Sequence, residues 1–104
     1  MQPTIRIAPY HRAGRLVPPE ARGLRAATVV LKPGQLMDWH STRAREELLV
    51  MLRGRARLEV RTQAARSWRL LAAGRCAFLP PDTEHRVVNR SAAAAMYIYV
   101  TGAA

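Results

Sequence analysis

Two spaced runs of residues combine side-chain types that can support metal-centred chemistry. The residues that define the runs are, in chain order, Gly34, His40, Thr42, Glu47, Gly54, Gly74, Pro80, Asp82, His85 and Asn89. Neutral imidazoles and a carboxylate suit divalent first-row metals, and two histidines with one carboxylate leave positions open for water, oxygen or substrate. This chemistry therefore depends on a fold that brings the two runs together.

The order and spacing of these residues resemble the two signature motifs of the cupin superfamily. The first motif of that family reads glycine, five residues, His-x-His, three or four residues, glutamate, six residues, glycine. The second reads glycine, five residues, Pro-x-Gly, two residues, histidine, three residues, asparagine. Eight of the ten positions match, and the resemblance covers residues 26–100; the departures are Thr42 in place of a metal-binding histidine and Asp82 in place of a glycine. The resemblance implies a small all-β, cupin-type barrel, a jelly-roll-like double-stranded β-helix.

The resemblance also implies the ligand set. By it, His40, Glu47 and His85 bind one divalent transition metal, and iron, manganese, nickel, copper and zinc all accept such a set. Thr42 is the weak point, because a neutral hydroxyl cannot replace an imidazole in kind. Water could fill that position, Thr42 could orient the water, or the affinity could fall too low for the metal to stay bound. Two histidines and one carboxylate are nevertheless sufficient in other folds.

Short apolar runs separated by turn residues predict an all-β barrel or sandwich. The runs expected as strands are 26–31, 47–52, 55–61, 68–71, 76–79, 85–88 and 94–100. No segment shows a convincing helical period with caps. We expect residues 1–25 to form an N-terminal arm and residues 26–104 to form a single barrel domain.

The alternation in residues 47–60 carries a prediction about partners. If Arg53 and Gly54 form a two-residue hairpin loop, one face of the hairpin is apolar apart from Glu47, as a barrel interior with one metal ligand would be. The opposite face then carries aliphatic side chains on one strand, and monomers seldom leave such a patch bare. Either the N-terminal arm or a second subunit must cover it. We favour a homodimer, in line with the similarity to small cupins, which are commonly dimers.

The composition bounds the class of protein. A chain of 104 residues with 49% hydrophobic residues is the size of one domain with a small core. No apolar run is long enough to span a membrane, and the first residues lack a signal-peptide pattern, so we expect a soluble, cytoplasmic protein. The single cysteine, Cys76, is expected to be buried as a small hydrophobic residue.

The formal net charge of +10 raises the question of nucleic-acid binding. Sixteen arginines stand against one lysine, beside eighteen alanines, a usage typical of a GC-rich bacterial genome. The arginines are spread from Arg6 to Arg90 without a block, and no nucleic-acid-binding motif accompanies them. We therefore expect a solvated basic surface that can favour small anions, and no nucleic-acid or membrane partner.

Two hypotheses about function remain open, since one fold serves many functions. In the first, a metal-dependent enzyme with oxygenase or isomerase-type chemistry acts on a small polar or anionic molecule. Arg43 and Arg45, on the Glu47 side of their strand, could contact the anion, and Tyr97 and Tyr99 could donate protons if they line the barrel. Arg86 is expected to point away from the site.

In the second hypothesis, a non-catalytic barrel binds or senses a ligand, and its metal site is degenerate or empty. A third, purely structural interpretation has the interior filled by apolar side chains, with no metal at all. The side chains that would fill it are Leu36, Leu49, Met51, Leu58, Phe78 and Met96. The volume of the interior cavity distinguishes this interpretation from the other two, because a filled barrel cannot admit a substrate.

Overall fold

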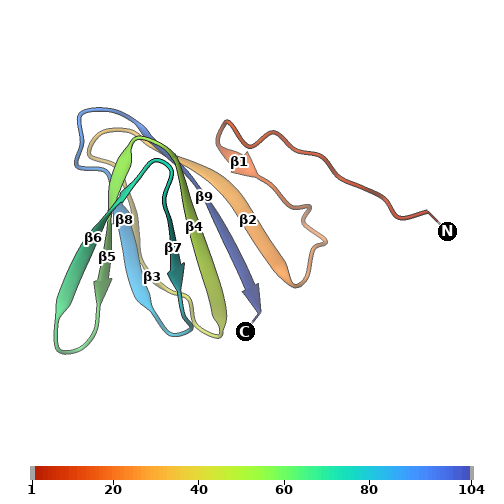
Figure 1. Cartoon of the computed structure of the whole chain (residues 1–104). Coiled ribbons are helices and arrows are strands. Elements are labelled where there is room, and N and C mark those ends of the chain that lie inside the picture. The colour runs from red at the N-terminus through yellow and green to blue at the C-terminus, as the bar shows by residue number, and fades with distance from the viewer. Residues whose placement is uncertain (1, 104) are drawn as a thin grey trace.

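The computed structural model describes residues 2–103, which form two antiparallel sheets and no helix (Figure 1). The strands of sheet A, in spatial order, are β1 (Gly14–Arg15), β2 (Leu24–Leu31), β9 (Ala95–Ala103), β4 (Arg45–Arg53) and β7 (Cys76–Leu79). Those of sheet B are β3 (Leu36–Ser41), β8 (Glu84–Val88), β5 (Arg55–Arg61) and β6 (Arg66–Ala72). The predicted all-β, cupin-type fold is confirmed.

The core lies between the two sheets and is built from alternate residues of their strands. Leu49 and Met51 of β4 are each 1% exposed, and Ala56 and Leu58 of β5 are also buried in the same cluster. Successive side chains of a strand point to opposite faces, so the residues between them point outward. The predicted inward face of residues 47–60 is therefore correct.

The predicted pairing of β4 with β5 is wrong. β4 pairs with β7 and β9 in sheet A, whereas β5 pairs with β6 and β8 in sheet B, so Arg53 and Gly54 carry the chain from one sheet to the other. Gly54 has φ +72, and a Cβ there would lie 2.5 Å from the carbonyl oxygen of Ala94. The crossing thus needs a glycine for both its backbone conformation and its close approach.

Two further expectations are corrected by the strand positions. Cys76 is exposed because it has outward parity on β7, at the edge of sheet A. Leu36 and Phe78 are 43% and 61% exposed, so they do not fill the interior. The strand β3, which carries His40, was not predicted, because the pattern of residues 36–41 is broken by a bulge between Met37 and His40.

Residues 2–13, which we call the free segment, precede the first strand and extend away from the sheets (Figure 1). Beyond them, β1 pairs with β2, so this part of the expected arm joins sheet A. None of the described residues belongs to a helix of the length and hydrophobicity that crossing a membrane requires.

Candidate metal site

His40 and His85 lie directly opposite each other on two paired strands. β3 and β8 run antiparallel in a register that sets His40 against His85, and their ring centroids are 4.3 Å apart. Directly opposed residues share one face of a sheet, so both rings point toward the interior. His85 is fully buried, whereas His40 lies at the exposed end of the pair.

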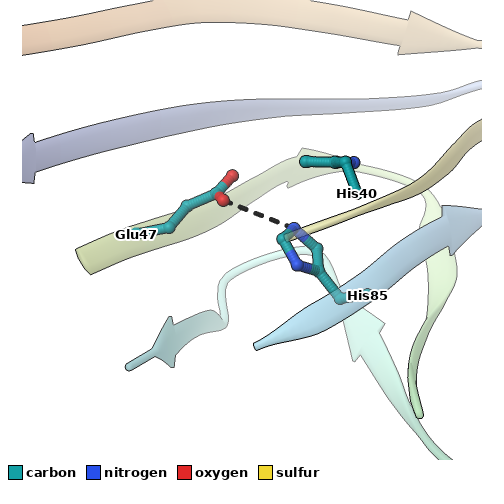
Figure 2. Close-up of side chains that lie close together, drawn as sticks. All are labelled: His40, Glu47 and His85. Carbon is teal, nitrogen blue, oxygen red and sulfur yellow. Dashed lines mark ion pairs between the residues drawn. The ribbon is translucent and has the colours of Figure 1, made fainter. Parts of the chain in front are cut away.

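Glu47 reaches the two histidines from the other sheet. It lies on β4 with the inward parity of Leu49 and Met51, and it is 6% exposed. The candidate ligand atoms of His40, Glu47 and His85 all lie within 4.8 Å of one another (Figure 2). Residues 45 positions apart in the sequence are therefore gathered at one place between the sheets.

The backbone determines the tautomer of both rings. Nδ1–H of His40 donates to the carbonyl oxygen of Asp38 at 2.8 Å, and Nδ1–H of His85 donates to that of Thr83 at 3.0 Å. Because a carbonyl oxygen only accepts, each neutral ring carries its proton on Nδ1 and has a free lone pair on Nε2. Histidines that ligate metals through Nε2 are commonly oriented by such a bond from the other nitrogen.

Nε2 of His85 is the buried atom whose partner is missing. It lies 3.3 Å from Oε1 of Glu47, but the geometry does not make a hydrogen bond in the neutral ring. Buried polar atoms normally have a partner, because leaving one without costs about 1–3 kcal/mol. A metal ion between this nitrogen and the Glu47 carboxylate would satisfy both groups, so the side chains present fit a metal.

A proton competes for the same nitrogen. Burial on its own lowers the pKa of His85, but the Glu47 carboxylate and the Thr83 carbonyl outweigh it, so the pKa is raised above its ordinary value of 6.5. The ring can thus exist either as an imidazolium paired with Glu47 or as a neutral ligand. This competition makes any metal affinity depend on pH.

Thr42 does not direct its hydroxyl toward the site. Its Oγ1–H donates to the carbonyl oxygen of Pro80 at 2.7 Å, and Oγ1 accepts from the backbone N–H of Thr83 at 3.0 Å. The hydroxyl therefore joins the turn before β4 to the turn before β8, and these turns carry Glu47 and His85 into place. Of the alternatives for this position, direct ligation by the hydroxyl finds no support in this geometry.

A cavity of about 570 Å³ opens beside the three side chains, within the range of small-molecule sites. The interpretation of a filled barrel is therefore wrong. Tyr97, Tyr99, Arg43 and Arg45 all line the cavity, as the sequence led us to expect. Burial raises the pKa of Tyr97 above its ordinary range, with the Glu47 carboxylate as a further cause, so the phenol keeps its proton.

The arginines around the cavity differ in how they are held. The guanidinium of Arg45 donates to Oγ1 and the carbonyl oxygen of Thr101, both at 3.0 Å, so it is held in place by its own chain. Arg43 and Arg25 line the cavity, and among residues 2–103 their side chains make no ion pair. Arg86, as expected, points away and pairs with Glu59 at 2.7 Å.

Arg25 is the cavity residue that the sequence interpretation missed. It precedes the run predicted as the first strand, yet β2 begins at Leu24. Its side chain shares the inward parity of Ala27, Val29 and Leu31, so extending that alternation backward would have found it. Asp38 also lines the cavity and adds a carboxylate at the side of His40.

Comparison with known families identifies this architecture. A family model described as cupin domain matches residues 27–101. The chain belongs to the cupin family. No curated protein sequence gave a match.

This cupin is similar to several solved structures. A Cupin 2 conserved barrel domain protein from Salinispora arenicola CNS-205 is 28% identical, with a TM-score of 0.73 over 100% of this chain and 88% of the other. The protein TT1209 from Thermus thermophilus is 25% identical, with a TM-score of 0.73 over 93% of this chain and 90% of the other. An oxalate oxidase is 18% identical with a TM-score of 0.70; the match covers 78% of this cupin and only 42% of that chain, and it shows a shared fold.

One departure from the cupin pattern is explained by the backbone. Asp82, where the motif has glycine, adopts φ +57, the left-handed conformation that glycine favours. Aspartate is among the few other residues that reach this region at modest cost, so the turn before β8 keeps its shape. The second departure, Thr42, also serves that turn through its bond to Thr83.

Proposed function

We propose that this cupin binds one divalent transition metal through His40, Glu47 and His85 and uses the adjoining cavity to bind a small anionic molecule. The observation that carries the proposal is the free Nε2 of buried His85, aimed at Glu47 while Nδ1 is held by a backbone carbonyl. When bound, a divalent metal would supply Lewis-acid or redox chemistry. Iron, manganese, nickel, copper and zinc all remain candidates, since cellular supply often decides among them.

The residues of the chain itself assign the anionic ligand. Arg43 and Arg25 line the cavity without an ion-pair partner among residues 2–103, and guanidinium groups bind carboxylates and phosphates through paired hydrogen bonds. Tyr97 adds a neutral phenol whose raised pKa keeps it a hydrogen-bond donor. Burial of Glu47 and His85 excludes bulk water from the inner end of the cavity.

The metal part of the proposal is tested by elemental analysis and titration calorimetry of tag-free protein. We expect about one transition metal per native chain, a loss of it in His85→Ala and Glu47→Ala, and full retention in His11→Ala, whose histidine is exposed and far from both motifs. Circular dichroism on each variant separates loss of metal from loss of fold. Equal metal content in all three variants would refute the assignment.

The anion part is tested with acetate, oxalate and succinate as probes of increasing size and charge. Arg43→Ala should weaken binding of the dianions about tenfold, which corresponds to roughly 1.4 kcal/mol. Arg69→Ala is the matched control, because it removes the same charge from an exposed position that does not line the cavity. Equal weakening by both variants would mean that only the overall positive charge attracts the anion.

A second candidate function is a metal-free barrel that binds or senses an anion. The observation that favours it is that Thr42 is committed to the turns, so the third imidazole of the cupin pattern has no substitute here. In that case the native chain would contain no metal yet would still bind the dianions with the Arg43 dependence described above. The two measurements together therefore distinguish the two functions.

A further inference from the structure

The outward face of sheet A carries a continuous apolar surface. We call it the outer patch, and its residues are Leu48, Val50, Cys76, Phe78, Ile98 and Val100. Leu48 of β4 is paired with Phe78 on one side and with Val100 of β9 on the other, so these side chains lie in one row across three strands. Phe78 is 61% exposed and Leu48 is 38% exposed. No charged side chain belongs to this row.

The crossing at Gly54 is the reason that the patch is so apolar. Had β4 and β5 formed a hairpin, the aliphatic side chains of β4 would have been flanked by Arg55 and Arg57. Instead, β5 lies in sheet B, and Arg57 stacks there on Trp68 with its Cζ 3.8 Å from the ring centroid. Sheet A therefore presents the aliphatic residues of β4 beside those of β7 and β9.

The free segment covers the other part of the same face. Oγ1–H of Thr28, which points outward from β2, donates to the carbonyl oxygen of Tyr10 at 2.8 Å. Thr28 is consequently only 3% exposed, while the part of the face over β4 and β7 stays open. The segment leaves the sheet from this point and runs outward (Figure 1).

The free segment itself carries apolar side chains that bury nothing within their own chain. Ile5 is 77% exposed and Ile7 is 95% exposed. Arg6 between them pairs with Glu20 of the same chain. In an extended chain, neighbouring side chains point in opposite directions, so the contact made by Arg6 turns both isoleucines away from the body.

We propose that a second copy of this chain covers the outer patch, with the free segments exchanged so that Ile5 and Ile7 of each copy pack on the outer patch of the other. The occupant is a second copy because the uncovered surface and the uncovered side chains that match it belong to the same chain. A two-fold arrangement satisfies both sets at once and closes without leaving a further sticky surface. Exposed apolar patches of this kind commonly mark such interfaces.

The oligomeric state of designed variants tests the proposal by sedimentation velocity. The native chain should be a dimer at micromolar concentration, and Ile7→Asp and Phe78→Asp should each raise the dissociation constant at least tenfold, because each places a charge in an apolar contact. Leu70→Asp is the matched control, since Leu70 is 53% exposed and lies on sheet B. A monomeric native chain, or a dimer that withstands both variants, would overturn the proposal.

Cross-linking through Cys76 tests the exchange itself. Ile7→Cys/Cys76→Ser is mixed with a native chain that carries a mass tag, and the mixture is oxidised after the subunits have exchanged. A disulfide between position 7 of one copy and Cys76 of the other gives a band of mixed mass on a non-reducing gel. Absence of this band from a mixture that still forms mixed dimers would refute the exchange of the free segments. Neither test depends on metal or anion binding, so the proposed function can fail or succeed separately.

Discussion

Replacement of Thr42 by valine separates a role in the turns from a role in metal binding. Valine keeps the shape and β-branching of threonine but removes the hydroxyl that bonds Pro80 and Thr83. Thr42 is buried, so the N–H of Thr83 loses its partner in a place where water reaches it poorly. Pro80 keeps one bond, from the hydroxyl of Thr83 at 2.9 Å. The expected cost is about 1–2 kcal/mol of unfolding free energy.

For a domain of this size, that cost corresponds to a fall in Tm of roughly 5–15 °C, which is measured by thermal unfolding followed by circular dichroism. Thr42→Ser should recover most of the loss, because it restores both hydrogen bonds. Thr62→Val, the same change at an exposed turn whose hydroxyl accepts from Ala64 and Ala65, should cost clearly less. Metal content should be equal in all of these variants. A Thr42→Val protein that loses its metal with an unchanged Tm would show that the hydroxyl serves the metal and not the turns.

Three further predictions rest on the same contacts. Metal affinity should rise about tenfold per pH unit until the pH exceeds the raised pKa of His85, whereas in the metal-free chain the stability contributed by that histidine is present below pH 6.5 and is lost as pH rises through the raised value; calorimetry and chemical unfolding across pH measure both. Gly74→Ala, at φ +87 in open space, should cost about 1 kcal/mol, and Gly54→Ala at least about twice that, because its Cβ would also meet Ala94; equal losses in urea unfolding would contradict this. Asn89→Ala should cost about 3 kcal/mol with metal content unchanged, since the buried amide makes four hydrogen bonds.

The fold and the gathering of three side chains could be predicted because both depend on short-range patterns. The spacing of glycines, histidines and a glutamate identified the family, and the parity of Glu47 with Leu49 placed the carboxylate inside. Pairing could not be predicted in the same way. A hairpin and a crossing between two sheets put the same residues of β4 and β5 inward, so alternation alone cannot distinguish them, and the decisive contact of Gly54 is with residue 94.

The parts of the site that the sequence did not reveal depend on contacts between distant turns. The role of Thr42 rests on backbone groups 38 and 41 residues away, and nothing in its own neighbourhood announces them. The tautomers of His40 and His85 rest on carbonyl groups only two residues away, yet they require the backbone geometry to be known. Arg25 was within reach of sequence reasoning but was assigned to the arm.

The outer patch and the candidate metal site share the strands β4 and β9, with opposite parities. Glu47 and Tyr99 point inward, whereas their neighbours Leu48 and Val100 point outward. All three candidate ligand atoms belong to one chain and lie on the inward face, so formation of the site does not need a partner. Phe78→Asp should therefore yield monomers with an undiminished metal content, as elemental analysis of the monomer fraction would measure. Loss of metal on dissociation would instead mean that the second copy holds β4 in the position that brings Glu47 to the histidines, and dimerisation would then belong to the function of the site.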